Sequence, residues 1–148
     1  MKVSVFLLSG LMVCAFAKAQ QPATPAAQIN LATAQKEALS QSSLVKNVPF
    51  KNIGPSIMSG RVVDLDVNPN KPSEFYVGYA SGGLWYTNNN GTTFEPVMDN
   101  SPTQNVGEVT VDWNSGTIWV GTGENNASRS SYAGIGLLKS TDKGQTWK

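Results

Sequence analysis

The feature that most constrains the fold of this chain is an octapeptide that occurs twice. Ser140–Trp147 reads S-x-D-x-G-x-T-W, and Thr87–Phe94 reads T-x-N-x-G-x-T-F. The glycine can adopt a left-handed backbone, and the Asp or Asn can accept backbone N–H bonds across a turn. Each octapeptide therefore predicts a tight turn between adjacent strands, with a hydroxyl pair across the strands and a large aromatic residue at its end. The residues with these structural roles are Ser140, Asp142, Gly144, Thr146 and Trp147, and Thr87, Asn89, Gly91, Thr93 and Phe94.

The sequence around the octapeptides repeats as well. Ile118–Gly121 matches Phe75–Gly78 at an offset of 43 residues, and Gly136–Ser140 matches Gly83–Thr87 at an offset of 53. The difference of ten residues predicts an insertion in the second copy, between Val120 and Gly136. A period of this size, rich in β-branched residues and punctuated by glycine, is typical of propeller blades.

Four short strands are predicted in the first copy, with turn residues between them. In the first strand, Val63, Leu65 and Val67 share one face, and Asp64 and Asp66 share the other. The aspartates are interpreted as a solvated face, or alternatively as a channel-facing pair that binds a cation or a sugar. The four strands are 62–67, 75–79, 84–87 and 93–97.

The pattern S-x-D-x-G-x-T-W is that of the Asp-box, or BNR repeat. On this motif and its partner, residues 50–148 resemble the β-propellers of sialidases, sortilin-type domains and secreted bacterial xyloglucanase-type proteins. Segments 52–62, 82–85 and 121–125 widen the resemblance. It implies an all-β fold built of blades of four antiparallel strands, with two blades present and the second incomplete. It also implies that Asp142 is structural, at the blade periphery, with catalysis or metal binding as the alternative.

The domain organisation follows from these patterns. One or two blades cannot close a propeller, which needs at least about four. We therefore expect a truncated, N-terminal piece of a longer protein, with residues 48–148 forming its first two blades. Residues 20–47 are predicted to be a linker, in which 30–39 could form a short helix capped by Asn30.

Residues 1–19 have the features of a secretory signal peptide: a lysine, an apolar stretch and an Ala-Lys-Ala cleavage site. A retained anchor helix is the alternative. The pattern predicts a secreted, periplasmic or cell-surface protein with no membrane span after cleavage. Cys14, the one cysteine, is a weak lipidation candidate that cleavage removes.

Composition narrows the possible ligands. The chain has no histidine, 11 basic and 10 acidic residues, and no basic block, so nucleic acid is not expected as a partner. No metal site, cofactor or thiol chemistry is predicted. The expected partner is a glycan or an extracellular protein or peptide.

The expected activity is binding, and the alternative is glycoside hydrolysis by carboxylates outside this chain. Related xyloglucanases carry a D-x-G-G pattern, but Ala80 stands at the position of its Asp. Sialidases of this fold use an arginine triad, whereas this chain has only Arg61 and Arg129. A third possibility is a receptor-like interaction propeller of the sortilin type.

The insertion at 122–135 is the best candidate for a ligand site, because long loops on a rigid scaffold commonly bind ligands. The alternative is a surface loop without such a role. Side chains of these types suit sugar hydroxyls or a peptide backbone. The candidate ligand-binding residues are Glu124, Asn125, Arg129 and Tyr132.

Overall fold

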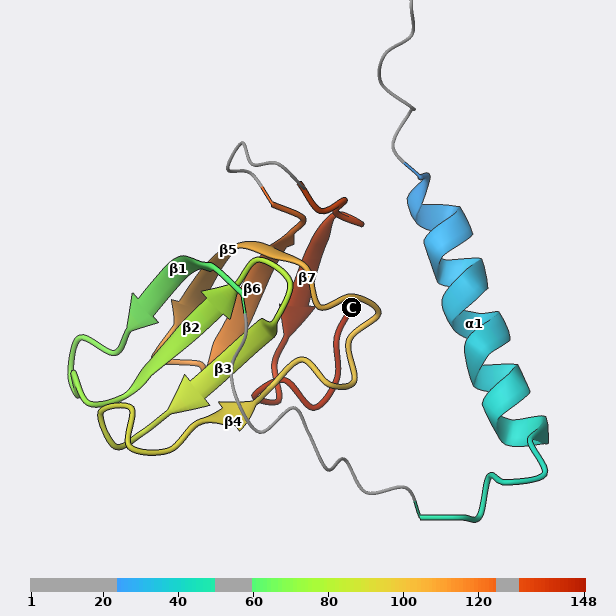
Figure 1. The fold of residues 1–148 in the computed structure, drawn as a ribbon, viewed down its shortest axis with the longest axis horizontal. Coiled ribbons are helices and arrows are strands. Elements are labelled where there is room, and N and C mark those ends of the chain that lie inside the picture. Colours follow the sequence, from blue (N-terminus) through green and yellow to red (C-terminus); the bar gives the residue numbers. More distant parts are fainter. Residues whose placement is uncertain (1–23, 50–59, 125–130) are drawn as a thin grey trace, which may run out of the picture.

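A computed structural model of the chain describes residues 24–49, 60–124 and 131–148. The predicted signal peptide with Cys14, the part 52–59 of the segment 52–62, and the candidates Asn125 and Arg129 lie outside these ranges. Figure 1 shows one helix followed by seven strands. They are α1 (Ala26–Ser42), β1 (Val62–Val67), β2 (Phe75–Tyr79), β3 (Gly83–Thr87), β4 (Glu95–Pro96), β5 (Val106–Asp112), β6 (Thr117–Thr122) and β7 (Leu137–Ser140).

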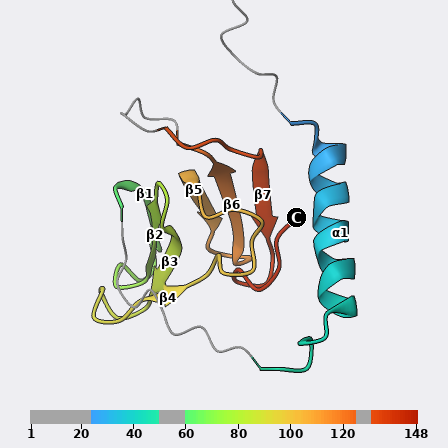
Figure 2. The same ribbon diagram turned by 45° about the vertical axis from the view of Figure 1, so that its right-hand side comes forward.

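The strands form two antiparallel sheets. The first sheet has the order β1-β2-β3-β4 and the second the order β5-β6-β7, so consecutive strands are always neighbours. Figure 2 shows the two sheets side by side as separate layers. Apart from α1, the regular structure of the described residues is all β, as the strand patterns predicted.

The strand boundaries agree with the sequence except at β4. A strand was expected over 93–97, but β4 contains only Glu95 and Pro96. Thr93 instead belongs to the turn, because its N–H donates to the Asn89 side chain at 3.0 Å. Proline has no N–H to give to a ladder, which limits pairing at Pro96 further.

The two sheets repeat one pairing scheme, residue for residue. Gly78 lies opposite both Asp64 and Leu84, and Gly121 lies opposite both Glu108 and Leu137. Both first strands carry a register shift at the same place, between Val62 and Asp64 and between Val106 and Glu108. Positions in β1 therefore correspond to positions 44 residues later in β5, and Gly78 corresponds to Gly121.

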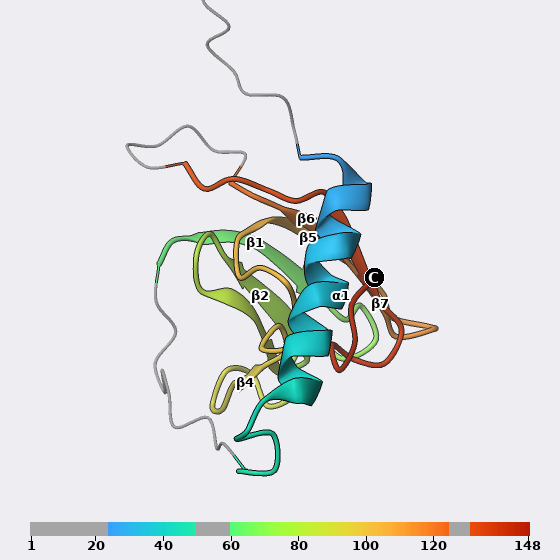
Figure 3. The same cartoon turned by 90° about the vertical axis from the view of Figure 1, so that its right-hand side faces the viewer.

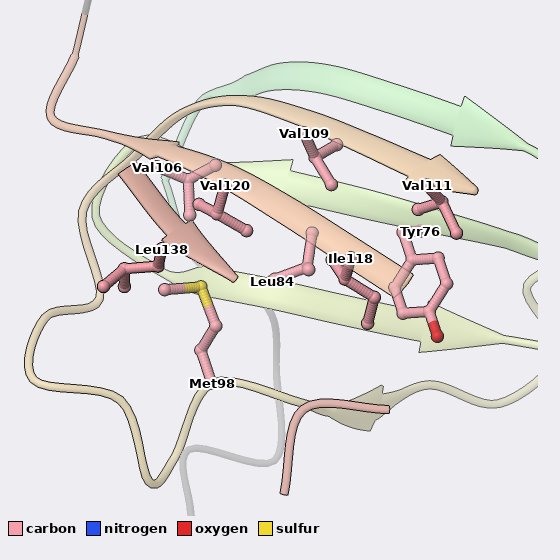
Figure 4. Packing of buried hydrophobic residues seen from close by; sticks show 9 residues of the cluster. All are labelled: Tyr76, Leu84, Met98, Val106, Val109, Val111, Ile118, Val120 and Leu138. Carbon is pink, nitrogen blue, oxygen red and sulfur yellow. The ribbon is translucent and has the colours of Figure 1, made fainter. Parts of the chain in front are cut away.

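The core lies between the sheets. Tyr76 and Leu84 of the first sheet face the apolar side chains of the second, as Figure 4 shows. The surfaces that face each other across this core are called the inner faces, and the opposite surfaces the outer faces. The buried cluster consists of Tyr76, Leu84, Met98, Val106, Val109, Val111, Ile118, Val120 and Leu138.

The orientation of β1 contradicts the interpretation of its aspartates as a solvated face. Leu65 and Val67 are 51% and 39% exposed on the outer face, whereas Asp64 and Asp66 point to the second sheet. The carboxylates are needed there because β5 is an edge strand, whose outward N–H groups lack a strand partner. Side chains of one sheet thus complete the hydrogen bonding of the other.

Helix α1 begins at Ala26, four residues before the expected cap Asn30, and it ends at Ser42. The preceding alanines and glutamine are good helix formers, which accounts for the longer helix. It has no buried residue, and it lies to one side of both sheets in Figures 1 and 2 and in front of them in Figure 3. Among the described residues, no helix is long and apolar enough to cross a membrane.

Candidate functional site

The connections of the two sheets divide into two ends. The β2–β3 turn and the β6–β7 loop lie at the end where β1 and β5 begin, whereas the turns of the two octapeptides lie at the opposite end. Figure 2 shows the returning arm of this loop, 131–136, above the ends of β6 and β7. The predicted ligand loop and the predicted structural turns are therefore separated by the length of the strands.

The base of the β6–β7 loop is closed by hydrogen bonds. Thr122 N–H donates to the carbonyl of Gly136 at 3.0 Å, and Ile135 N–H donates to the Thr122 hydroxyl at 2.8 Å. One step further out, Glu124 N–H donates to the carbonyl of Tyr132 at 3.0 Å. These bonds hold Glu124 and Tyr132 beside each other at the mouth of the loop.

Glu124 pairs with an arginine from the first sheet. The Arg61 Nε donates to Glu124 Oε1 at 2.9 Å, and Arg61 Nη2 donates to the same oxygen. The Glu124 side chain is 0% exposed, whereas that of Arg61 is 48% exposed. The hydrogen bond from the guanidinium to Glu124 raises the pKa of Arg61. The pair thus bridges the start of β1 and the end of β6.

One carboxylate oxygen of Glu124 has no hydrogen-bond partner among the described residues. Oε2 of Glu124 is buried and accepts no hydrogen bond from the described residues. Buried carboxylate oxygens nearly always have a donor, and leaving one unpaired costs ~1–3 kcal/mol. A ligand hydroxyl or amide N–H that reached this oxygen would satisfy it.

Of the four candidates, two are brought together. Glu124 and Tyr132 flank the loop mouth, and Tyr132 is 36% exposed. Arg61 joins them, although nothing in its sequence position indicated this role. Asn105, directly before β5, donates its side-chain amide to the carbonyl of Ala133 at 3.1 Å and so holds the returning arm of the loop.

A cavity of about 400 Å³ lies beside the β2–β3 turn. Its one indole, Trp85, is 7% exposed and donates its Nε1–H to the carbonyl of Gly82 at 2.7 Å. Sequence reasoning did not single out this cavity, since its wall joins β3 to residues that follow β4. The lining residues are Ser81, Gly82, Leu84, Trp85, Pro96, Asp99 and Gln104.

At the opposite end, the turn of the second octapeptide is organised around Asp142. Its Oδ1 accepts the Ser140 hydroxyl at 2.8 Å and the Thr146 N–H at 2.9 Å, and its Oδ2 accepts the Thr146 hydroxyl at 2.5 Å. The two hydroxyls therefore both donate to the Asp142 carboxylate. The sequence had instead predicted that they pair with each other across the strands. Hydrogen bonds from Thr146, and then from Ser140, lower the pKa of Asp142 to about 2.

In the turn of the first octapeptide, the side-chain amide of Asn89 takes the position of the Asp142 carboxylate. Asn89 Oδ1 accepts the Thr87 hydroxyl at 2.9 Å, and Asn89 Nδ2 donates to the Thr93 hydroxyl at 2.8 Å. Gly91 and Gly144 have φ of 80° and 86°, in the left-handed region that glycine adopts at little cost. The degenerate octapeptide therefore builds the same turn as the complete one.

The aromatic residues that end the octapeptides differ in their surroundings. Trp147 packs against the core, and its Nε1–H donates to the carbonyl of Val97, just after β4 of the first sheet, at 3.2 Å. Phe94 makes an edge contact with Phe75 of its own sheet, with ring centroids 6.1 Å apart. Only the second aromatic residue, Trp147, has an inter-sheet hydrogen bond of this kind.

Comparison with known proteins adds no further identification. No known family matches the chain, and a search of curated proteins finds no match.

Proposed function

We propose that this chain is part of a secreted Asp-box β-propeller that binds a glycan at the mouth of the β6–β7 loop. The buried Oε2 of Glu124, which has no hydrogen-bond partner among the described residues and is held in place through Arg61, carries the proposal. Secretion is inferred from the signal-like residues 1–19. The three parts of this proposal rest on separate observations.

The propeller assignment is supported by the matched register of the two sheets. The pairing partners, the position of the register shift and the turn geometry recur in both. The backbone N–H and carbonyl of Lys148 form hydrogen bonds with the carbonyl and N–H of Lys139. Lys148 thus lies beside Lys139 as Glu95 lies beside Tyr86 in the first sheet. Repetition of one sheet unit with face-to-face packing is the principle on which propellers are built.

The choice of a glycan follows from the polar groups at the loop mouth. Glu124 offers a buried acceptor, and Arg61 offers a half-exposed set of donors beside it. A pair of neighbouring sugar hydroxyls can donate to the first and accept from the second. Tyr132, 36% exposed, adds an amphipathic ring of the kind that packs on a sugar face.

The opposite end is less suited to a ligand. The carboxylate of Asp142 is occupied by hydroxyl and N–H donors of its own turn. Asp64 and Asp66, considered as a cation or sugar site, are used by the backbone of β5. Within the ranges that the structure describes, Glu124 is the carboxylate with a buried oxygen that accepts no hydrogen bond.

Glycan-array binding of the chain tests this function, followed by titration with the glycan that binds. Glu124→Gln presents an amide donor where the carboxylate accepted, so binding should fall at least ~10-fold. Tyr132→Ala should weaken binding as well. Glu95→Gln, an exposed position on β4, is the matched control and should leave binding unchanged.

Two results would refute the site. The first is binding that is unaffected by Glu124→Gln and Tyr132→Ala. The second is selective binding of peptides in place of glycans, which would move the proposal to a protein-binding module. Circular dichroism of each variant separates a lost site from a lost fold.

A further inference from the structure

We propose that a cavity between the two sheets, beside the turn of the second octapeptide, binds a small zwitterion, with its quaternary ammonium group inside and its anionic group at the rim. The cavity has a volume of about 170 Å³ and is lined by both sheets of this chain and their turns. It lies at the end opposite the β6–β7 loop, so the inference does not depend on the glycan site. The side chains that give it its chemistry are Asn68, Glu74, Tyr76, Tyr86, Trp113 and Lys143.

The size of the cavity limits what it can hold. Pockets that bury drug-sized ligands have volumes of ~300–1,000 Å³. A cavity of about 170 Å³ has room for a small organic ion, but not for an oligosaccharide or a folded peptide. The ligand is therefore expected to be a small molecule.

Three aromatic rings meet in the wall of the cavity. The ring centroid of Tyr76 lies 4.9 Å from that of Tyr86 and 5.5 Å from that of Trp113, with the ring planes tilted by 42° and 43°. Figure 4 shows Tyr76 at one end of the buried cluster, with its hydroxyl oxygen pointing away from the other labelled side chains. Aromatic rings attract cations electrostatically, and quaternary ammonium ligands are recognised by groups of such rings. The wall therefore suits an organic cation with an apolar surface.

Glu74 supplies negative charge to the cavity. Its Oε1 accepts the Tyr86 hydroxyl, and its Oε2 accepts the Asn68 side-chain amide at 2.9 Å. The hydrogen bond from Tyr86 is the largest of the effects that lower the pKa of Glu74, so the carboxylate is ionised at neutral pH. Asp66 accepts the Trp113 Nε1–H at 2.5 Å and adds a second negative charge beside the aromatic wall. Each oxygen of Glu74 already has a donor, so this carboxylate offers charge rather than a vacant acceptor.

This arrangement selects among cations. A primary ammonium group brings three N–H donors, and a hard metal ion needs several oxygen ligands. Among the described residues, no group of three or more acidic, histidine or cysteine side chains could hold a metal ion. A quaternary ammonium group donates no hydrogen bond, so it needs no vacant acceptor and can pack its methyl groups against the rings. Sugar hydroxyls do need acceptors, which is why this end of the sheets suits a glycan less well.

Lys143 sets the charge at the rim. It is exposed in the turn of the second octapeptide. Its charge and that of Lys71 both contribute to the lowered pKa of Glu74, so both lie within electrostatic range of the cavity. A cation at the rim repels a simple cationic ligand but attracts the anionic end of a zwitterion. A carboxylate within the cavity and a lysine at its rim therefore match a ligand of the betaine type.

The charged groups of the cavity are not part of the repeated packing scheme. By register, Glu74 corresponds to Thr117, which carries no charge. Lys143 corresponds to Asn90 of the first octapeptide, which is also uncharged. The repeat builds its sheets and turns without these charges, so they are free to serve a ligand at this one boundary.

NMR titration of the chain tests the proposal, with glycine betaine, tetramethylammonium and acetate as probes. The ring currents of the aromatic wall should shift the N-methyl protons of bound betaine upfield, and the Trp113 indole N–H should shift as the cavity fills. Glu74→Gln keeps an acceptor for the Tyr86 hydroxyl and removes the charge, so it should weaken betaine binding at least ~10-fold. Acetate, which lacks the ammonium group, should bind at least ~10-fold more weakly than betaine.

Lys143→Asn distinguishes a zwitterion site from a site for any organic cation. Asn90 occupies the equivalent position with φ of 58°, against 57° at Lys143, so the variant is compatible with the turn. It should weaken betaine binding ~5-fold and leave tetramethylammonium binding unchanged or tighter, because repulsion at the rim is lost. Lys46→Asn, at an exposed position after α1, is the matched control and should change neither.

Four results would each overturn the proposal. They are the absence of saturable betaine binding, acetate that binds as tightly as betaine, betaine binding that is unaffected by Glu74→Gln, and a Lys143→Asn variant that weakens both cationic probes equally. Circular dichroism verifies that each variant is folded. Because Lys143 lies in an exposed turn, its variant keeps the test decisive even if Glu74→Gln does not fold.

Discussion

The Asp64 carboxylate accepts the backbone N–H of Val109 at 2.7 Å, across the boundary between the two sheets. Its other oxygen accepts the N–H of Leu65 at 2.8 Å, on its own strand. By register, Leu65 and Val109 are equivalent residues of the two sheets. One side chain therefore ties together the same position in two successive repeats.

Asp66 extends the same arrangement two residues further along β1. It accepts the Val111 N–H at 2.9 Å and the Trp113 Nε1–H at 2.5 Å. The ring centroids of Trp113 and Tyr76 lie 5.5 Å apart. Burial raises the pKa of Tyr76 to about 12. The two carboxylates thus fix the distance and the relative register of the sheets.

Glycines at equivalent positions should respond differently to the same substitution. Gly78→Ala forces a Cβ to within 2.9 Å of Val106 Cγ1, and overpacking of this kind costs ~1–3 kcal/mol of unfolding free energy. Gly121→Ala meets no atom closer than 3.8 Å, so its effect should stay within ~0.5 kcal/mol. Urea unfolding of both variants measures the difference, and equal losses would contradict the packing described.

The lowered pKa of Asp142 predicts that the unfolding free energy of the chain falls at acid pH. Its pKa is lowered to about 2 from 3.8, so its ionised form stabilises the fold above pH 3.8. That contribution is lost as the pH falls from 3.8 towards 2. Asp142→Asn, which can copy the bonds made by Asn89, should remove this pH dependence. The stability difference between the wild type and the variant should therefore shrink over this range in urea titrations.

The first turn provides the matched control for this prediction. Asn89→Asp introduces a carboxylate into an equivalent set of donors, from Thr87 and Thr93. It should add acid sensitivity where Asp142→Asn removes it. If neither variant changed how the unfolding free energy depends on pH, the Asp142 carboxylate would not be the cause of the loss of stability at acid pH.

Replacing Arg61 and replacing Glu124 should lower the unfolding free energy by unequal amounts. Arg61→Met leaves a buried carboxylate without its cation, whereas Glu124→Gln leaves a half-exposed guanidinium that water can solvate. We expect the loss of unfolding free energy to be larger for Arg61→Met than for Glu124→Gln. Thermal unfolding compares the two, and a greater loss for Glu124→Gln would argue against the buried position of the carboxylate.

Local patterns in the sequence predicted most of the strands and both turns. β1, β2 and β3 coincide with the predicted strands to within one residue, because β-branched runs bounded by turn residues depend on local preferences. The positive φ of Gly91 and Gly144 follows from the octapeptide in the same way. These features need no knowledge of the tertiary contacts.

The faces of β1 could not be predicted from the same patterns. Alternation separated the aspartates from Leu65 and Val67 correctly, but the usual inference that charge faces water gave the wrong side. The unsatisfied N–H groups of β5 decide the orientation, and they lie 45 residues away. Arg61 was overlooked as a partner of Glu124 for a similar reason, since 63 residues separate them.

Amide hydrogen exchange tests most directly the claim that side chains of one repeat hydrogen-bond the edge strand of the next. In the wild type, the Val109 amide should be protected although it lies on the open edge of β5. In Asp64→Ala it should exchange faster, by at least ~10-fold, because the loss of its acceptor leaves it unpaired. The amide of Val120 in the middle of β6 is the internal reference and should change less. A Val109 amide that exchanges at the same rate in both proteins, with Val120 unchanged, would contradict the account.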